Sequence, residues 1–293
     1  MKKSILALLV FISACGTQKQ LTDQTQAADK LFLEKNYTAA YQAYNDIISQ
    51  SQAKGKTVPA QIFASAGKSL YLSNKKAEGI ALLDQAEAGG FVDEQSLLLR
   101  IYYYKEIDNM SKELTRIEQY KTAYPNGSEM NFVNERLFLH NAEMKEYPKV
   151  KEVYALLDAQ TADKIANLEI IYKASKKLNE DDNADKYAAR IFEKDPENLT
   201  GLRYKAESVF YKVENEYVAA IKAYNKNQTT STYNAMRKKI DPLAPRFKAA
   251  KNYYIKLYSL SKEPADAAVL SRICERLNDP KNAKYYKNLS KKQ

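Results

Sequence analysis

The sequence has no tryptophan, one histidine and two cysteines in 293 residues. His140 has no second histidine or cysteine nearby to complete a zinc site, and its context offers no nucleophile for it to activate. Cys274 lies at helical spacing from Leu270 and Leu277, which is typical of a small core residue. We therefore expect no metal, no cofactor and no enzymatic activity, although sequence alone leaves a paired-carboxylate site open.

Glycine and proline are also scarce, with eight of each. The pair Gly89-Gly90 is interpreted as a turn, because no glycine-rich phosphate loop surrounds it. The prolines fall between periodic segments or at helix starts, and no stretch alternates apolar and polar residues as a half-buried strand would. The chain is therefore predicted to be all-α from about residue 24 onward.

The first fifteen residues are ordered as an export signal. Two lysines follow the initial methionine, an apolar run covers 5–12, and Ser13 and Ala14 precede Cys15. This layout is typical of a signal peptide that is cleaved just before the cysteine. The apolar run is too short to cross a bilayer, which takes about 20 helical residues.

The segment Ile12-Ser13-Ala14-Cys15-Gly16 resembles the bacterial lipobox. The resemblance implies a signal peptide over 1–14 and acyl chains, palmitate among them, on Cys15 at the start of the mature protein. More than one chain is needed for lasting membrane attachment. The polar residues that follow predict a flexible tether over 15–26. The alternative is an ordinary secretory signal with a chance cysteine.

The formal net charge is +10, and removal of the two lysines in 1–14 leaves +8. The densest basic run is expected in the tail, at 281–292. A basic balance favours anionic lipid head groups, cell-wall polymers or acidic proteins, or it is a solvated surface with no dedicated partner. No nucleic-acid recognition motif is present, so we expect no nucleic-acid partner.

Three segments share one pattern: NYTAAYQAY at 36–44, EYPKVKEVY at 146–154 and EYVAAIKAY at 216–224. Each has a tyrosine, a small or β-branched residue three positions later and a second tyrosine four beyond that. These positions share one helical face, where the small residue admits a neighbouring helix and the aromatic fills the space beside it. The predicted packing residues are Tyr37, Ala40, Tyr44, Tyr147, Tyr217, Ala220 and Tyr224.

This pattern resembles the tetratricopeptide repeat (TPR), a unit of 34 residues that forms two antiparallel helices. Further matches place Gly67 and Gly79 at the small positions of one helix pair, and Ala184 in another that ends at Asp195-Pro196. Corresponding points recur every 34 to 39 residues. The resemblance implies an α-solenoid of TPR-like helix pairs forming a superhelix, similar to TPR lipoproteins of the Bacteroidetes, with repeats over 27–228.

The region 229–293 departs from the pattern. We expect the helix that contains Tyr224 to continue over 233–239, with an interruption at 241–245. A longer amphipathic helix is predicted over 247–260, and a final helical hairpin begins at Pro264.

Tyrosine clusters occur at 102–104, 253–254 and 285–286. Because consecutive helical residues point about 100° apart, at least one tyrosine of each cluster should face away from the core. Tyr102, Tyr103 and Tyr104 are the candidate binding residues, since tyrosine buries area at low entropy cost. The alternative is that tyrosine serves only as the packing aromatic of this chain.

Two functions are compatible with these features. The first is a lipid-anchored interaction scaffold or assembly factor of the cell envelope, whose concave groove holds an envelope protein or peptide. The second is a glycan-capture or cell-wall-associated lipoprotein of the outer membrane, although sugar platforms usually employ the tryptophan that is missing here. The resemblance to bacterial lipoproteins implies an outer-membrane location facing the periplasm. Cys15 is followed neither by the acidic residue that marks inner-membrane retention in enteric bacteria nor by the acidic run linked to surface display in Bacteroidetes.

Overall fold

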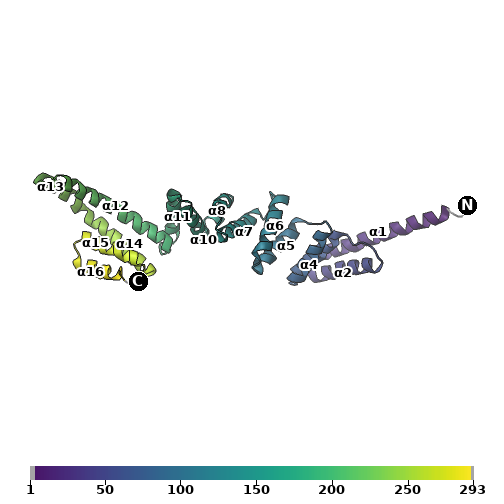
Figure 1. Ribbon diagram of the computed structural model, residues 1–293. Coiled ribbons are helices and arrows are strands. Elements are labelled where there is room, and N and C mark those ends of the chain that lie inside the picture. Colours follow the sequence, from purple (N-terminus) through teal and green to yellow (C-terminus); the bar gives the residue numbers. More distant parts are fainter. Residues whose placement is uncertain (1–3, 292–293) are drawn as a thin grey trace. The chain divides into compact units, whose positions relative to one another are not determined.

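The computed structural model describes the backbone of residues 4–291 and the side chains of residues 19–291. Within that range the chain forms helices and turns and contains no strand, which confirms the predicted all-α class. It divides into two compact units, Met1–His140 and Asn141–Gln293. The helices carry the labels shown in Figure 1.

The first unit is built from successive helices that pack against their neighbours along the chain. Short turns fold each second helix back on the first. Its helices are α1 (Ser4–Leu33), α2 (Tyr37–Ala53), α3 (Ala60–Leu72), α4 (Lys76–Ala88), α5 (Glu94–Glu106) and α6 (Met110–Ala123), followed by α7 (Met130–Glu143), which runs past the unit boundary.

The second unit contains shorter helices followed by a long one. Its helices are α8 (Tyr147–Tyr154), α9 (Ala159–Ala162), α10 (Ile165–Lys177), α11 (Asp181–Lys194), α12 (Leu199–Lys226), α13 (Thr230–Ile240), a 3₁₀ turn η1 (Asp241–Leu243), α14 (Ala244–Ser261), α15 (Pro264–Arg276) and α16 (Pro280–Leu289). Helix α12 packs against α11, α13 and α14, and α15 packs against both α14 and α16.

One type of turn closes six of these helix pairs. In each, a single residue has a left-handed backbone, its N–H bonds to the carbonyl three residues earlier, and the next N–H bonds to the carbonyl five residues earlier. This is the Schellman motif, which usually has glycine at the left-handed position. Here that position holds Lys35, Asn74, Asp108, Lys145, Asn179 or Asn278. The first five are spaced by 39, 34, 37 and 34 residues, which matches the expected repeat period.

The predicted packing residues lie at the helix contacts. Ala40, Tyr44, Ala184 and Ala220 are buried, whereas Tyr37, Tyr147, Tyr217 and Tyr224 are half-buried. Gly67 of α3 and Gly79 of α4 are buried as well, and a methyl group added to either would lie 2.8 Å or less from a backbone atom of the facing helix. The sequence pattern therefore identified two points of close helix approach, at Gly67 and Gly79, but not the one at Gly201, where an added methyl group would lie 2.5 Å from the backbone nitrogen of Phe192.

The predicted tether over 15–26 differs from the structure. Helix α1 runs without a break over Ser4–Leu33, and Leu21 packs against the first hydrophobic core. The reason is that no helix breaker occurs between Leu21 and Leu33, while Leu21, Thr25 and Ala28 recur on one face. The predicted signal peptide over 1–14 and the acylated Cys15 depend on side chains outside the described range, so both stay predictions.

The third tyrosine segment differs from the other two in its place within a helix. Tyr37 and Tyr147 begin α2 and α8, whereas Tyr217 lies inside α12, which is continuous over 28 residues. Arg276 of α15 donates two hydrogen bonds, of 3.0 and 2.7 Å, to the buried Glu214, and its guanidinium lies 4.2 Å from the Tyr217 ring centre. These contacts join α12 to α15 at this segment.

The expected continuation from Tyr224 to 239 is also wrong. Helix α12 ends at Lys226, and Thr229 begins α13 with a reciprocal capping box to Thr232. The helices expected after the interruption are present as α14, α15 and α16, which begin at Ala244, Pro264 and Pro280. The interruption itself is shorter than the expected 241–245, because only the 3₁₀ turn Asp241–Leu243 separates α13 from α14.

Candidate partner-binding groove

A continuous groove runs between α1 and α3 in the first unit. It consists of two adjoining hollows that share Asp29, Gln61 and Ser65. Toward the N-terminal end of α1 it is also lined by Leu21, Thr22, Thr25, Gln26, Pro59 and Ile62, and toward the other end by Phe32, Leu33, Tyr44 and Lys68. Both walls are first helices of their pairs, as expected for the inner surface of a helical-repeat array.

Polar and apolar groups alternate along this groove. Gln26 and Asp29 on α1 lie opposite Gln61 and Ser65 on α3, so amide, carboxylate and hydroxyl groups are available on the two walls. Leu33 forms an apolar edge with 80% of its surface exposed. A groove with these donors, acceptors and apolar edge suits the backbone and side chains of an extended peptide.

The floor of the groove is tied to the core through Tyr44. Its hydroxyl donates a short hydrogen bond to the Asp29 carboxylate. Burial of the Tyr44 ring, followed by this bond to a carboxylate, raises the pKa of its phenol far above the ordinary value. The tyrosine therefore stays neutral and holds Asp29 in place.

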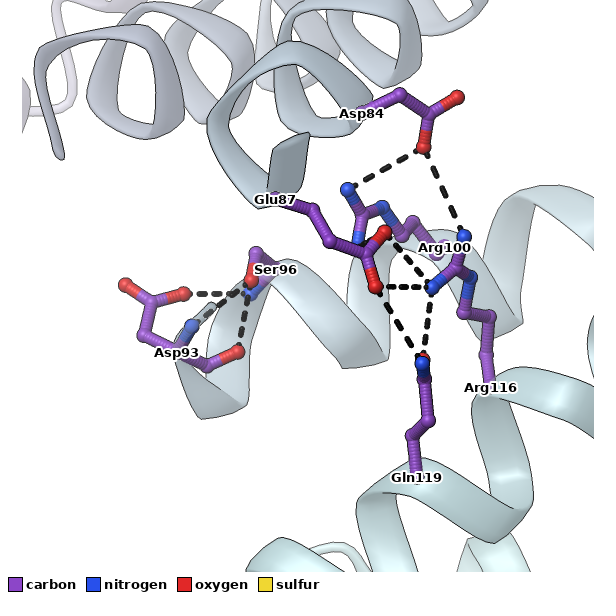
Figure 2. Close-up of polar contacts among 7 residues, drawn as sticks. All are labelled: Asp84, Glu87, Asp93, Ser96, Arg100, Arg116 and Gln119. Atoms are coloured by element: carbon purple, nitrogen blue, oxygen red, sulfur yellow. Dashed lines mark hydrogen bonds and ion pairs between the residues drawn. The ribbon is translucent and has the colours of Figure 1, made fainter. Parts of the chain in front are cut away.

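The α3 wall is tied to the next helix pair. Lys68 Nζ donates a 2.6 Å hydrogen bond to Asp93 Oδ2. Asp93 caps α5 through a reciprocal box with Ser96, which Figure 2 shows. Burial acts to raise the pKa of Asp93, but the bonds from Lys68 and Ser96 outweigh it and lower that pKa. The charged pair fixes α3 relative to α5.

A buried arginine network joins α4, α5 and α6 (Figure 2). Arg100 is fully buried, and its guanidinium lies 3.2 Å from Asp84 and 3.2 Å from Glu87. These are ion-pair contacts rather than aligned hydrogen bonds. Arg116 adds hydrogen bonds of 2.8 and 2.9 Å to Glu87 and one of 2.7 Å to Gln119.

The network is balanced in charge, with two guanidinium groups and two carboxylates. Burial raises the pKa of Glu87, but the bond from Arg116 and the charge of Arg100 outweigh it and lower that pKa. For Arg100, burial and then the charge of Arg116 lower the pKa. A carboxylate held ionised in this way is a poor proton shuttle near neutral pH, so the network serves to lock neighbouring helix pairs.

A second buried cluster lies between α6 and α7. The Glu113 carboxylate, with 1% of the residue exposed, accepts bonds of 2.5 and 2.9 Å from Arg136, and His140 Nε2 lies 3.0 Å from its Oε2. Burial acts against ionisation, but Arg136 and His140 lower the pKa of Glu113 to about 2. The lone histidine of the sequence therefore faces a carboxylate within the fold.

Sequence reasoning missed Glu113 and Arg100 as central residues. The signal was present for Glu113, since it shares a helical face with the buried Ile117 and Tyr120. A charged side chain on an apolar face indicates a buried partner, but the partner itself becomes known only when α7 is placed. Across the described residues, no group of three or more histidine, cysteine, aspartate or glutamate side chains has the arrangement of a metal site.

The tyrosine prediction is wrong for Tyr104, which is buried with 3% of its surface exposed. Tyr102 is half-buried, with its ring 4.8 Å from that of Phe132 and its hydroxyl 3.5 Å from Glu129. Tyr103 packs beside the first core. The cluster is therefore used largely for packing, and a binding role for Tyr102 and Tyr103 stays a prediction.

No protein-family model and no curated protein matches this sequence. Solved structures with a related arrangement of helices include a TPR protein from Parabacteroides merdae, at 13% identity, covering 89% of this chain and 99% of that chain with a TM-score of 0.43. Another is the C-terminal part of a TPR-containing protein from Cytophaga hutchinsonii, at 16% identity, 92% and 100% coverage and a TM-score of 0.39.

A third similar structure, from Bacteroides ovatus, has 15% identity, covers 64% of this chain and 100% of that chain, and has a TM-score of 0.44. All three TM-scores are below 0.5. The helix pairing described above therefore rests on the contacts within this chain alone. Among the helices that the structure describes, none has the length and apolar character needed to pass through a bilayer.

Proposed function

We propose that this protein is a non-enzymatic interaction scaffold of a bacterial cell envelope, anchored by lipid on Cys15, whose α1–α3 groove binds an extended segment of an envelope protein. The observation that carries the proposal is the groove itself, with polar groups on both walls and an exposed apolar edge at Leu33. We also propose that the protein is located at the outer membrane and faces the periplasm.

The position of Cys15 supports a partner close to the membrane. Cys15 and Thr22 belong to the same helix, α1. At 1.5 Å per residue, the seven residues between them separate the anchor from the groove by about 10 Å along the helix axis. An acylated Cys15 therefore confines the groove to the membrane surface, which raises its effective concentration for membrane partners.

Photocrosslinking in intact cells tests the groove. A photoreactive amino acid at Gln61, on the groove wall, is expected to give one discrete adduct, whereas the same residue at Ala81, exposed on α4 and outside the groove, gives none. The bulky, charged Ser65→Arg change is expected to abolish the Gln61 adduct by filling the groove. Equal adducts at both positions, or none at Gln61, would contradict the proposal.

Labelling of cells with palmitate tests the anchor separately. The Cys15→Ala variant lacks the thiol that carries the acyl chains, so we expect it to take up no label and to retain an unprocessed signal segment. Cys274→Ala is the matched control and should be labelled and processed like the parent, because this second cysteine is buried in the core. A Cys15→Ala chain that is processed and labelled like the parent would rule out lipidation at Cys15 without bearing on the groove.

A further inference from the structure

The positive charge of this chain is concentrated in two segments. Residues 217–262 contain ten lysines and arginines and a single acid, Asp241, a net charge of +9. The tail at 281–292 adds five lysines and no acid. The remaining 235 residues carry 31 basic and 35 acidic side chains, so the largest excess of positive charge lies in 217–262.

The structure folds this segment into helices that pack against one another, which we call the basic arm and define as residues 217–262. It comprises the C-terminal part of α12, then α13, η1 and α14. Helices α13 and α14 both pack against α12, and Figure 1 shows α13 at the end of the hairpin that α12 and α14 form. Tyr224 and Tyr233 contact edge to face at 5.9 Å and hold α13 in place.

Helix α13 contributes no buried residue. Its N-terminus is capped by the reciprocal hydrogen bonds between Thr229 and Thr232. The helix is therefore formed although none of its side chains is buried in the core. Most side chains of α13 are exposed and are therefore available for contact with a partner.

The charges of the arm differ in their partners. Both arginines are engaged within the unit, Arg237 with Asp241 at 2.8 Å and Arg246 with Glu216 at 2.5 and 2.7 Å. Lys251 and Lys256 are likewise paired, with Asp279 and Glu197. In the described part of the chain, five exposed lysines near α13 have no carboxylate within 4 Å: Lys222, Lys226, Lys238, Lys239 and Lys248.

The pairing of these charges favours one kind of anionic partner over others. Arginine, whose planar guanidinium gives bidentate hydrogen bonds, is best suited to bind a folded protein or an isolated phosphate. Both arginines of the arm are already paired with carboxylates of this chain. Unpaired lysines are compact, hydrated charges on flexible stems, which suit a broad surface of diffuse negative charge. We propose that the basic arm docks on the head groups of an anionic lipid membrane. This contact is independent of acylation at Cys15 and of the α1–α3 groove.

Vesicle flotation tests the proposal on the full chain carrying Cys15→Ala, so that no acyl chain contributes. Binding is measured as the ratio between vesicles of phosphatidylglycerol with phosphatidylcholine and vesicles of phosphatidylcholine alone, because the apolar run at 5–12 binds both kinds. We expect preference for the anionic vesicles that weakens as salt is raised.

The arm variant changes Lys222, Lys226, Lys238 and Lys239 to glutamine. At about fivefold per lysine near an anionic surface, its binding to the anionic vesicles is expected to fall at least 100-fold. The matched control changes Lys281, Lys284, Lys287 and Lys291 to glutamine and is expected to stay within about threefold of the parent, although it loses the same charge. Changing the four arm lysines to arginine should retain binding, because the sign of the charge is kept.

Helical content and melting temperature show whether the arm variant, with its four glutamines, folds. If it does not fold, the variant with four arginines still tests whether binding follows the positive charge of the arm. Unchanged binding of the arm variant, an equal loss in the tail variant, or no preference for anionic vesicles would each overturn the proposal. Arm-dependent binding to polyglutamate without binding to vesicles would overturn it in favour of an acidic protein.

Discussion

The Gly79→Ala variant is expected to be less stable than the parent by about 2 kcal/mol, and Gly79→Val by more. Helix propensity alone predicts the opposite, since alanine is favoured over glycine by about 1 kcal/mol in a helix interior. The structure decides the sign, because a Cβ at this position would lie 2.6 Å from the backbone nitrogen of Tyr71 and 2.7 Å from the carbonyl oxygen of Gly67. Backbone atoms of α3 cannot move aside as a flexible side chain could.

Urea unfolding followed by circular dichroism, with amide hydrogen exchange in α3 and α4, measures this loss. Ala81→Val is the matched control, because it places the same β-branched side chain on an exposed position of α4 and should cost only about 0.5 kcal/mol. A Gly79→Ala chain that is as stable as the parent would show that α3 and α4 do not approach as closely as described. The α1–α3 groove would then lose the support of its α3 wall.

Removing the buried carboxylate of Glu113 is expected to cost about 3 kcal/mol or more. In Glu113→Gln, the guanidinium of Arg136 loses one of its two acceptor oxygens and its counter-charge, and His140 loses its neighbouring carboxylate, which leaves the charge of Arg136 without compensation in a largely buried site. The matched control is Glu118→Gln, which changes an exposed residue of the same helix and should stay within about 0.5 kcal/mol of the parent.

The same cluster predicts a pH dependence of defined sign. Because the pKa of Glu113 falls from 4.5 to about 2 on folding, its ionisation stabilises the folded state above pH 4.5, and that contribution is lost as the pH falls toward 2. At 1.36 kcal/mol per pKa unit, the contribution is about 3 kcal/mol. The difference in unfolding free energy between the parent and Glu113→Gln should therefore shrink steadily from pH 5 to pH 2.

Unfolding free energies at several pH values between 2 and 6 give this difference directly. A gap that stays constant over the range would mean that Glu113 is not ionised against Arg136 in the folded state. A gap that widens toward low pH would reverse the assigned sign.

Much of the helical framework could be predicted from local features. Prolines at helix starts located α15 and α16, and the recurrence of small and aromatic residues located the close contacts of Ala40, Gly67 and Gly79. The turns were harder, since the left-handed positions hold lysine, asparagine or aspartate in place of glycine. The sequence indicated the period at which these turns recur, but the left-handed residue of each turn was identified only from the backbone.

The candidate site was predicted less fully. A groove lined by first helices follows from the repeat pattern, but the residues that line it do not. Tyr104 illustrates the difficulty, because three adjacent tyrosines on one helix cannot be sorted by sequence into core and surface without the position of α6 and α7.

The sequence by itself determined the all-α class, the positions of most helices and the faces on which they meet, because helical hydrogen bonds and side-chain periodicity act over three or four residues. Only the tertiary structure decided that Leu199–Lys226 is one continuous helix and that Glu113 is enclosed by Arg136 and His140. Those outcomes depend on ion pairs between residues 23 to 62 positions apart, and no local pattern specifies which buried charge meets which.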